Sequence, residues 1–167
     1  MRQQIYSLLV DNNPGVLSRI AGLFSRRGYS IDSITAGITP DSNYTKITVV
    51  TTGEEQILAQ IENQVRKLED VREITMLGEE ESVARELIMV KLGVEPGKRS
   101  EIVALADIFR AKVVHVGAKT MIIELTGNYG KLEGFLDLLE GYEVLELART
   151  GLTALSRDEK EVLIDAQ

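Results

Sequence analysis

Residues 12–15, Asn-Asn-Pro-Gly, form the segment of this 167-residue chain whose side chains are best suited to binding a small molecule. They follow a short apolar run and precede a helical pattern, where Asn13 is a favourable N-cap and Pro14 a favourable first helical residue. The free N–H groups of that first turn would bind a carboxylate or phosphate, and Gly15 would let the ligand approach the backbone. Asn12 adds a donor and an acceptor, as a zwitterion requires. The alternative is an ordinary strand-to-helix turn without a ligand.

No catalytic arrangement stands out elsewhere in the sequence. The chain has one histidine and no cysteine, which excludes disulfides, thiolate catalysis and Cys-ligated zinc. His115 lies between two valines in a strand pattern, and we expect a half-buried structural histidine rather than a base. Residues 127–131, Gly-Asn-Tyr-Gly-Lys, lack the spacing of a P-loop, so we expect a strand-to-helix turn there. We therefore do not expect this chain to be an enzyme on its own.

The composition indicates a soluble, folded protein. Apolar residues make up 44% of the chain, which is enough for a packed core. The formal net charge of −7 argues against nucleic acid, whose binding depends on clustered Lys and Arg. No stretch approaches the about 18 apolar residues of a membrane span, and the first residues lack the apolar region of a signal peptide. We expect a cytoplasmic protein with no membrane partner.

The sequence carries one pattern twice. Two Pro-Gly pairs stand 82 residues apart, at 14–15 and 96–97. The same offset aligns apolar residues of the two halves, pairing Ile20 with Ile102, Leu23 with Leu105, Ile31 with Val113 and Ile34 with Val116. Further along, an offset of 74 pairs Leu58 with Leu132, Ile61 with Phe135 and Val65 with Leu139. The chain therefore contains an internal structural repeat.

Each half reads strand, helix, strand, strand, helix, strand. Apolar runs and helical spacing predict strands over 5–10, 29–38, 45–51 and 71–77 in the first half, with helices over 14–27 and 54–68. In the second half they predict strands near 86–94, 112–117, 120–126 and 142–149, with helices near 98–110 and 129–139. A βαββαβ unit folds into a four-stranded antiparallel sheet with both helices on one face. The predicted fold class is α+β, with two tandem ferredoxin-like units.

The same patterns place the domain boundaries. We expect a first domain over 1–78, a charged linker over 79–84 and a second domain over 85–157. Residues 156–159, Ser-Arg-Asp-Glu, resemble a capping box and predict a short helical tail over 158–167. The open face of each sheet needs cover, which suggests association through sheet faces or edges.

The repeat offers an internal comparison for the turn at 12–15. At the offset of 82, Val94 and Glu95 stand where the first half has Asn12 and Asn13. An apolar residue offers an anion nothing, and an acidic residue repels it. If the turn binds an acidic or zwitterionic ligand, we expect that binding in the first half and not in the second.

Several segments match a pattern that is known from other proteins. Two consecutive segments read LLVDNNPGVLSRI, over 8–20, and GLFSRRGYSI, over 22–31. They resemble the N-terminal ACT domain of the small subunit of acetolactate synthase, also called acetohydroxyacid synthase. The segments ELARTG, over 146–151, and ALSR, over 154–157, are similar to the C-terminal signature of that family. The strand that opens its second domain is similar to RELIMVK, over 85–91.

This resemblance implies a regulatory subunit without an active site. In that family the small subunit binds the large catalytic subunit, activates it and confers feedback inhibition by valine or a related branched-chain amino acid. Thiamine diphosphate, magnesium and FAD belong to the catalytic subunit, so no cofactor or metal is expected in this chain. Small subunits of the family form homodimers whose ACT domains lie side by side, with effector sites at the interface.

The resemblance also assigns effector-binding positions. They lie in the first turn or at the start of the second strand, and are Asn12, Asn13, Pro14, Gly15, Val16, Ser30 and Ile31. Family members often have an Asn where this chain has Ser30, whose hydroxyl reaches less far and lacks an amide. The identity or affinity of the effector depends on that difference.

Two other functions are open on the sequence. A free-standing ACT-type amino-acid sensor or dimerisation module would bind the effector without affecting any synthase. A small ferredoxin-like enzyme would lose turnover in a His115→Ala variant.

Overall fold

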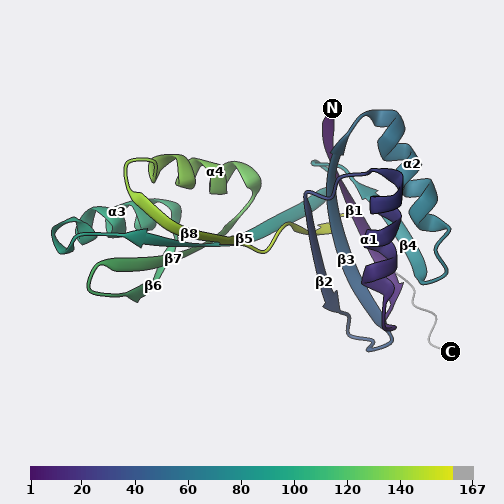
Figure 1. Cartoon of the computed structure of the whole chain (residues 1–167), viewed down its shortest axis with the longest axis horizontal. Helices are drawn as coiled ribbons and strands as arrows, with labels where there is room; N and C mark the ends of the chain where they lie inside the picture. The colour runs from purple at the N-terminus through teal and green to yellow at the C-terminus, as the bar shows by residue number, and fades with distance from the viewer. Residues whose placement is uncertain (160–167) are drawn as a thin grey trace. The chain divides into compact units, whose positions relative to one another are not determined.

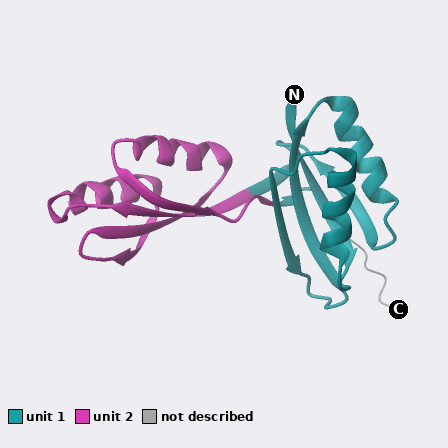
Figure 2. Cartoon of the chain, viewed as in Figure 1, with its two compact units in different colours: residues 1–84, 154–167 teal, residues 85–153 magenta. Residues whose placement is uncertain are grey.

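The computed structural model describes residues 1–159, which form two units of the same topology (Figure 2). The first unit contains residues 1–84 and the described residues from Ala154 on, and the second contains Arg85–Thr153. Each is built on an antiparallel sheet in the order strand, helix, strand, strand, helix, strand. The predicted α+β class with two tandem ferredoxin-like units is confirmed.

In the first unit, both helices cover the same face of the sheet (Figure 1). Its elements are β1 Arg2–Asp11, α1 Val16–Arg27, β2 Ser33–Ile38, β3 Tyr44–Gly53, α2 Glu55–Arg66 and β4 Val71–Leu77. The strand order is β2-β3-β1-β4, which leaves β2 and β4 at the edges. Because side chains alternate along a strand, Tyr6, Leu8 and Val10 of β1 all face the helices and are buried there.

The second unit has the same arrangement. Its elements are β5 Ser82–Gly93, which begins in the last residues of the first unit, the short 3₁₀ helix η1 Pro96–Lys98, α3 Arg99–Phe109, β6 Lys112–Val116, β7 Thr120–Gly127, α4 Tyr129–Leu138 and β8 Glu143–Arg149. The strand order is β6-β7-β5-β8. Asn128 caps α4 by accepting a hydrogen bond from the backbone N–H of Lys131 over 3.0 Å. Residues 127–131 therefore form the expected strand-to-helix turn.

The turn after the first strand is held in the same way in both units. The N–H of Asn12 donates to the carbonyl of Asn43 over 2.7 Å, and the N–H of Val94 donates to the carbonyl of Lys119 over 2.9 Å. Asn12 and Val94 are the positions that the offset of 82 aligns. The second unit is therefore a structural control for the turn of the first.

Two strands begin elsewhere than the sequence pattern predicts. β2 begins at Ser33 rather than at residue 29, because the N–H of Tyr29 bonds to the carbonyl of Phe24 over 2.9 Å and closes the end of α1. β5 begins at Ser82, inside the segment expected as a linker over 79–84. The Ser82 hydroxyl donates to the carbonyl of Gly78 over 2.6 Å, which closes a turn and returns the chain to an extended form.

The described C-terminal residues form a short strand directly before the expected helical tail. β9, Thr153–Ser156, pairs with β5. The N–H of Arg157 then donates to the carbonyl of Glu81 over 2.8 Å, so residues 157–159 are not helical. The rest of the expected tail lies outside the described residues.

His115 is exposed, so the prediction of a half-buried structural histidine was wrong. It lies on β6, at the edge of the sheet, opposite Ile122 of β7 and after a shift in register. Ile122 alternates with the buried residues Met121 and Ile123, so His115 is on the face that the helices leave uncovered.

Candidate functional site

The turn between β1 and α1 ends at a glycine in the left-handed conformation. The N-cap of α1 is Gly15, with φ 83° and ψ 0°, and the first helical residue is Val16, whose side chain is buried in the core. The prediction of Asn13 as N-cap and Pro14 as first helical residue was therefore wrong. The carbonyl of Asn13 instead accepts a hydrogen bond from the N–H of Val16 over 3.4 Å, in a turn that precedes the helix. Because a positive φ costs other residues about 1–2 kcal/mol, this position favours glycine.

The first turn of α1 presents free backbone N–H groups at this place. The first regular helical bond runs from the N–H of Arg19 to the carbonyl of Gly15, over 2.9 Å. The N–H groups of Leu17 and Ser18 precede it and have no partner within the helix. With the helix dipole, they favour an anion at this end of α1. Residues 12–15 are exposed, so a solute can reach the turn.

Asn12 holds the turn to the connection between β2 and β3. Its Nδ2 donates to the carbonyl of Ser42 over 2.9 Å, and its Oδ1 accepts from the hydroxyl of Thr45 over 3.1 Å. The sequence suggested that Asn12 supplies a donor and an acceptor to a ligand, and its nitrogen and its oxygen each make one bond within the chain. One amide N–H and one lone pair of the oxygen remain for a ligand.

Two ion pairs flank the turn, and the sequence reasoning missed both. Arg19 Nε lies 2.6 Å from Asp70 Oδ2, and Arg72 donates from Nε and Nη2 to Asp11 over 2.6 and 2.7 Å. The hydrogen bond from Arg19 holds the pKa of the Asp70 carboxyl below its ordinary value, and the side chain of Asn13 adds to this effect. Arg19 and Asp70 are 51 residues apart, and no local pattern signals such a contact.

Ser30 and Ile31 lie at the other end of the sheet from the turn. The carbonyl of Ser30 accepts a hydrogen bond from the hydroxyl of Thr51. Thr51 pairs with Gln4 near the start of β1, whereas the turn follows the end of β1. Ile31 is partly buried against the core of the unit. A single chain therefore does not bring Ser30 and Ile31 to residues 12–16.

In the second unit, side chains of the chain itself fill and hold the corresponding turn, between β5 and α3. Val94 is buried, and Glu95 precedes η1, which replaces the first turn of an α-helix. Arg99 donates from Nη2 to the carbonyls of Gly117 and Ala118, over 2.7 and 2.9 Å. These contacts tie the turn to the connection between β6 and β7. This turn is therefore less suited to binding an anion than the turn at Gly15 is.

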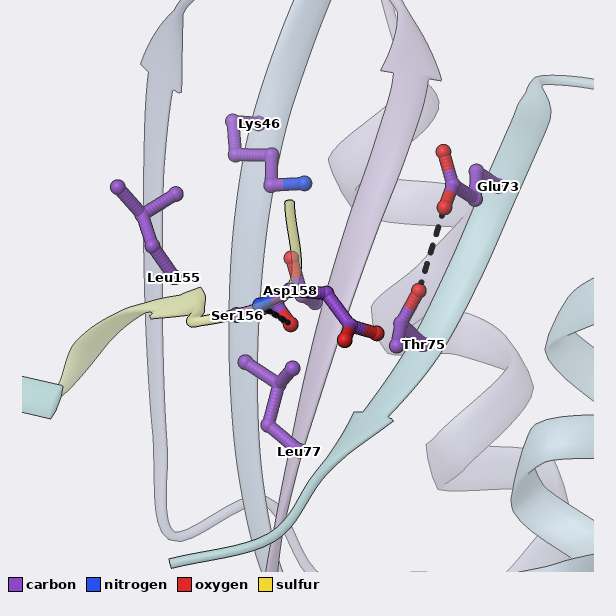
Figure 3. Close-up of a pocket in the computed structure, with 8 residues that line it drawn as sticks. Lys46, Glu73, Thr75, Leu77, Leu155, Ser156 and Asp158 are labelled. Atoms are coloured by element: carbon purple, nitrogen blue, oxygen red, sulfur yellow. Dashed lines mark hydrogen bonds between the residues drawn. The ribbon is translucent and has the colours of Figure 1, made fainter. Parts of the chain in front are cut away.

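A cavity of about 320 Å³ lies on the face of the first sheet that the helices leave open (Figure 3). Lys46 of β3, Glu73 of β4 and Asp158 after β9 contribute its charged groups. Burial lowers the pKa of the Lys46 ammonium, and the charge of Glu73 partly offsets this. The hydroxyl of Thr75 donates to Glu73 over 3.3 Å. Charges of both signs line this hollow, so it favours an anion less clearly than the turn at Gly15 does.

Residues 1–159 contain no group of three or more His, Cys, Asp and Glu side chains that could hold a metal ion. Among the helices in this part of the chain, none is long and apolar enough to cross a membrane.

Comparison with known families covers both units. The family model described as "AHAS small subunit-like ACT domain" matches residues 6–73, and the model described as "Small subunit of acetolactate synthase" matches residues 85–158. The chain belongs to the acetolactate synthase small-subunit family. The resemblance of the turn segment and of the C-terminal segments to that family is thereby confirmed.

Individual members of the family match along almost their whole length. The probable acetolactate synthase small subunit of Archaeoglobus fulgidus is 42% identical over 93% of this chain and 97% of its own length. The acetolactate synthase small subunit of Haemophilus influenzae is 40% identical over 96% of this chain and 99% of its own length. The crystal structure of the acetolactate synthase small subunit from Thermotoga maritima has a TM-score of 0.87 at 36% identity, covering 96% of this chain and 100% of that chain.

Proposed function

We propose that this chain is the regulatory subunit of an acetolactate synthase in branched-chain amino acid biosynthesis. It binds the large catalytic subunit, activates it and confers feedback inhibition by valine or a related amino acid. The observation that carries the proposal is the exposed turn at Gly15, where free N–H groups begin a helix beside Arg19. This arrangement suits an amino-acid carboxylate, and it occurs in a chain whose two units both match the small-subunit family.

The chemistry of the reaction belongs, in this proposal, to the catalytic subunit. That subunit holds the thiamine diphosphate, magnesium and FAD, and the small subunit acts on it allosterically in the cytoplasm. The residues around the turn are ion-paired arginines and aspartates, namely Arg19 with Asp70 and Arg72 with Asp11. They hold a loop in place and would bind a charged solute, but they do not form a nucleophile with its base.

The complete effector site is proposed to form in a homodimer. β2 is an edge strand, and α1 connects β1 to β2, so α1 lies nearest to that edge. Near it, Ile38 is 75% exposed and Leu17 is 47% exposed. Antiparallel pairing of two β2 edges about a twofold axis would set the two α1 helices side by side in opposite directions. The turn of one chain would then approach the partner's Ser30 and the partner's Ile31.

Feedback inhibition follows from such a site by thermodynamic coupling. The effector's carboxylate would bind at the turn, and its branched side chain would be buried against apolar residues of the interface. Full burial of such a side chain contributes about 1.5–3 kcal/mol. Coupling between two sites is typically about 1–3 kcal/mol, and it is reciprocal. We therefore expect the holoenzyme to bind the effector with an affinity different from that of the isolated small subunit.

The experiment is an acetolactate synthase assay of the matching large subunit, with and without this chain, across a valine titration. We expect the rate to rise when the chain is added and to fall as valine increases. Activation without inhibition by valine would direct the same titration to leucine and isoleucine, since Ser30 differs from the common Asn. Valine binding without any effect on the large subunit would favour a free-standing amino-acid sensor instead.

A further inference from the structure

Arg19 lies beside the turn with part of its guanidinium unused. Its Nε donates to Asp70 over 2.6 Å, and within residues 1–159 neither Nη1 nor Nη2 has a hydrogen-bond partner. A guanidinium carries five N–H donors in a planar fork, so a bond at Nε leaves the two Nη atoms for a second carboxylate. The side chain is 49% exposed, so a solute can reach it.

The unused end of this guanidinium lies over Gly15. A Cβ added at residue 15 would be 3.0 Å from Nη1 of Arg19 and 3.9 Å from its Cζ. The guanidinium is therefore in contact distance of the turn whose free N–H groups begin α1. A carboxylate bound at this turn would lie within reach of both kinds of donor.

The second unit has the opposite charge at the equivalent position. The offset of 82 places Glu101 where the first unit has Arg19. Glu101 accepts a hydrogen bond over 2.9 Å from the hydroxyl of Tyr142, which precedes β8 as Asp70 precedes β4. Both units thus connect their first long helix to the segment before their last sheet strand. Since an acidic residue makes this connection in the second unit, the connection alone does not require an arginine.

We propose that Arg19 recognises the carboxylate of the amino-acid effector through Nη1 and Nη2, while Asp70 holds its Nε. This inference rests on the proposed function, because it assigns a role within the same effector site. Arg19 then selects for a free α-carboxylate, and the apolar side chain of the ligand contributes independently. A ligand that has an amide in place of the carboxylate does not gain from Arg19.

The test is calorimetric titration of the full-length protein with L-valine and with L-valinamide. Arg19→Met removes the donors and keeps the length of the side chain. We expect its affinity for valine to fall about tenfold or more, because a hydrogen-bonded charge pair is lost. Its affinity for valinamide, already weaker in the wild type, remains unchanged. Arg19→Lys keeps the charge without the fork and is expected to be intermediate.

Two further variants separate recognition from support of the turn. Asp70→Asn weakens the ion pair but leaves the guanidinium in place, so it retains the preference for valine over valinamide. Arg66→Met makes the same change of charge at an exposed ion pair on α2, with Glu62 as partner. It is expected to change neither affinity.

Three outcomes would overturn the inference. If Arg19→Met keeps the wild-type ratio of valine to valinamide affinity, Arg19 does not recognise the carboxylate. If Arg19→Met and Asp70→Asn weaken both ligands equally, the pair supports the turn and nothing more. Wild-type protein that binds neither valine, leucine nor isoleucine would contradict the proposed function itself, and the role of Arg19 with it.

Discussion

Gly15 is the residue at which backbone conformation, charge and solvent access coincide. Its φ of 83° is one that few side chains adopt, and any Cβ there would contact Arg19. Asp and Asn tolerate the left-handed region better than most residues do. An acidic substitution therefore changes the charge of the turn at a small cost to the fold.

Gly15→Asp would place a carboxylate where the proposed ligand's carboxylate binds. We expect valine binding and valine inhibition to be lost, while the fold and the activation of the large subunit remain. The free energy of unfolding should fall by about 1 kcal/mol, which is the cost of the positive φ. Calorimetry with valine on the folded variant measures the binding, and an unchanged affinity would contradict the assignment of the site. The matched control is Glu95→Gln, in the equivalent turn of the second unit, and it should leave valine affinity as it is.

At the scale of elements, the two units end their first long helix in the same left-handed conformation with different residues. Gly28 follows α1 with φ 68°, and Arg110 follows α3 with φ 58°. Gly28 and Arg110 cap their helices in the same way, because the N–H of each donates to carbonyls of the last helical turn. Glycine adopts this conformation without strain, whereas arginine does not.

This difference predicts opposite effects of two substitutions on stability. Arg110→Gly should raise the free energy of unfolding by about 0.5–1 kcal/mol, because it relieves the strain of a positive φ. Gly28→Ala should lower it by about 1 kcal/mol. A Cβ at Gly28 would meet no atom within 4 Å, so that cost comes from the backbone alone. Urea denaturation measures both, and two changes of the same sign would count against this account of the helix ends.

At the scale of the whole molecule, the proposed effector site needs a second copy of the chain. Ser30 is kept apart from residues 12–16 by the length of the sheet, because it is held to Thr51 near the start of β1. The β2 edge supplies a surface on which a second copy could pair, and Ile38 on that edge is 75% exposed. Binding of the effector and association of the chains are therefore expected to be linked.

Ile38→Lys tests this link without disturbing the core. We expect the dissociation constant of the dimer to rise about tenfold or more. Burial of the Ile38 side chain would contribute about 1.5–3 kcal/mol to association, and the variant replaces it with a charge. Valine affinity should fall together with dimerisation. Sedimentation equilibrium and calorimetry measure the two effects. Ile108→Lys, at a residue of α3 that is 72% exposed, is the matched control and should change neither. A variant at Ile38 that stays dimeric and binds valine normally would argue against pairing through β2.

Local patterns in the sequence were sufficient to predict most of the fold. Alternating apolar residues, helical spacing and the two Pro-Gly pairs predicted the α+β class and the repeated βαββαβ order, because these features depend on neighbours along the chain. They also singled out the turn at 12–15 as a candidate site, which stays a prediction. They misplaced the start of α1, since the left-handed conformation of Gly15 delays the helix to Val16.

Contacts between residues far apart in the sequence could be identified only in the folded chain. Arg19 meets Asp70 across 51 residues, and the carboxamide of Asn12 is engaged by Ser42 and Thr45, because sheet register brings separate loops to one end of the unit. β9 likewise forms because a distant strand, β5, offers it a partner. The sequence specifies which side chains can form hydrogen bonds and ion pairs. Which partners they find depends on the register of the strands, and no short segment of sequence carries that information.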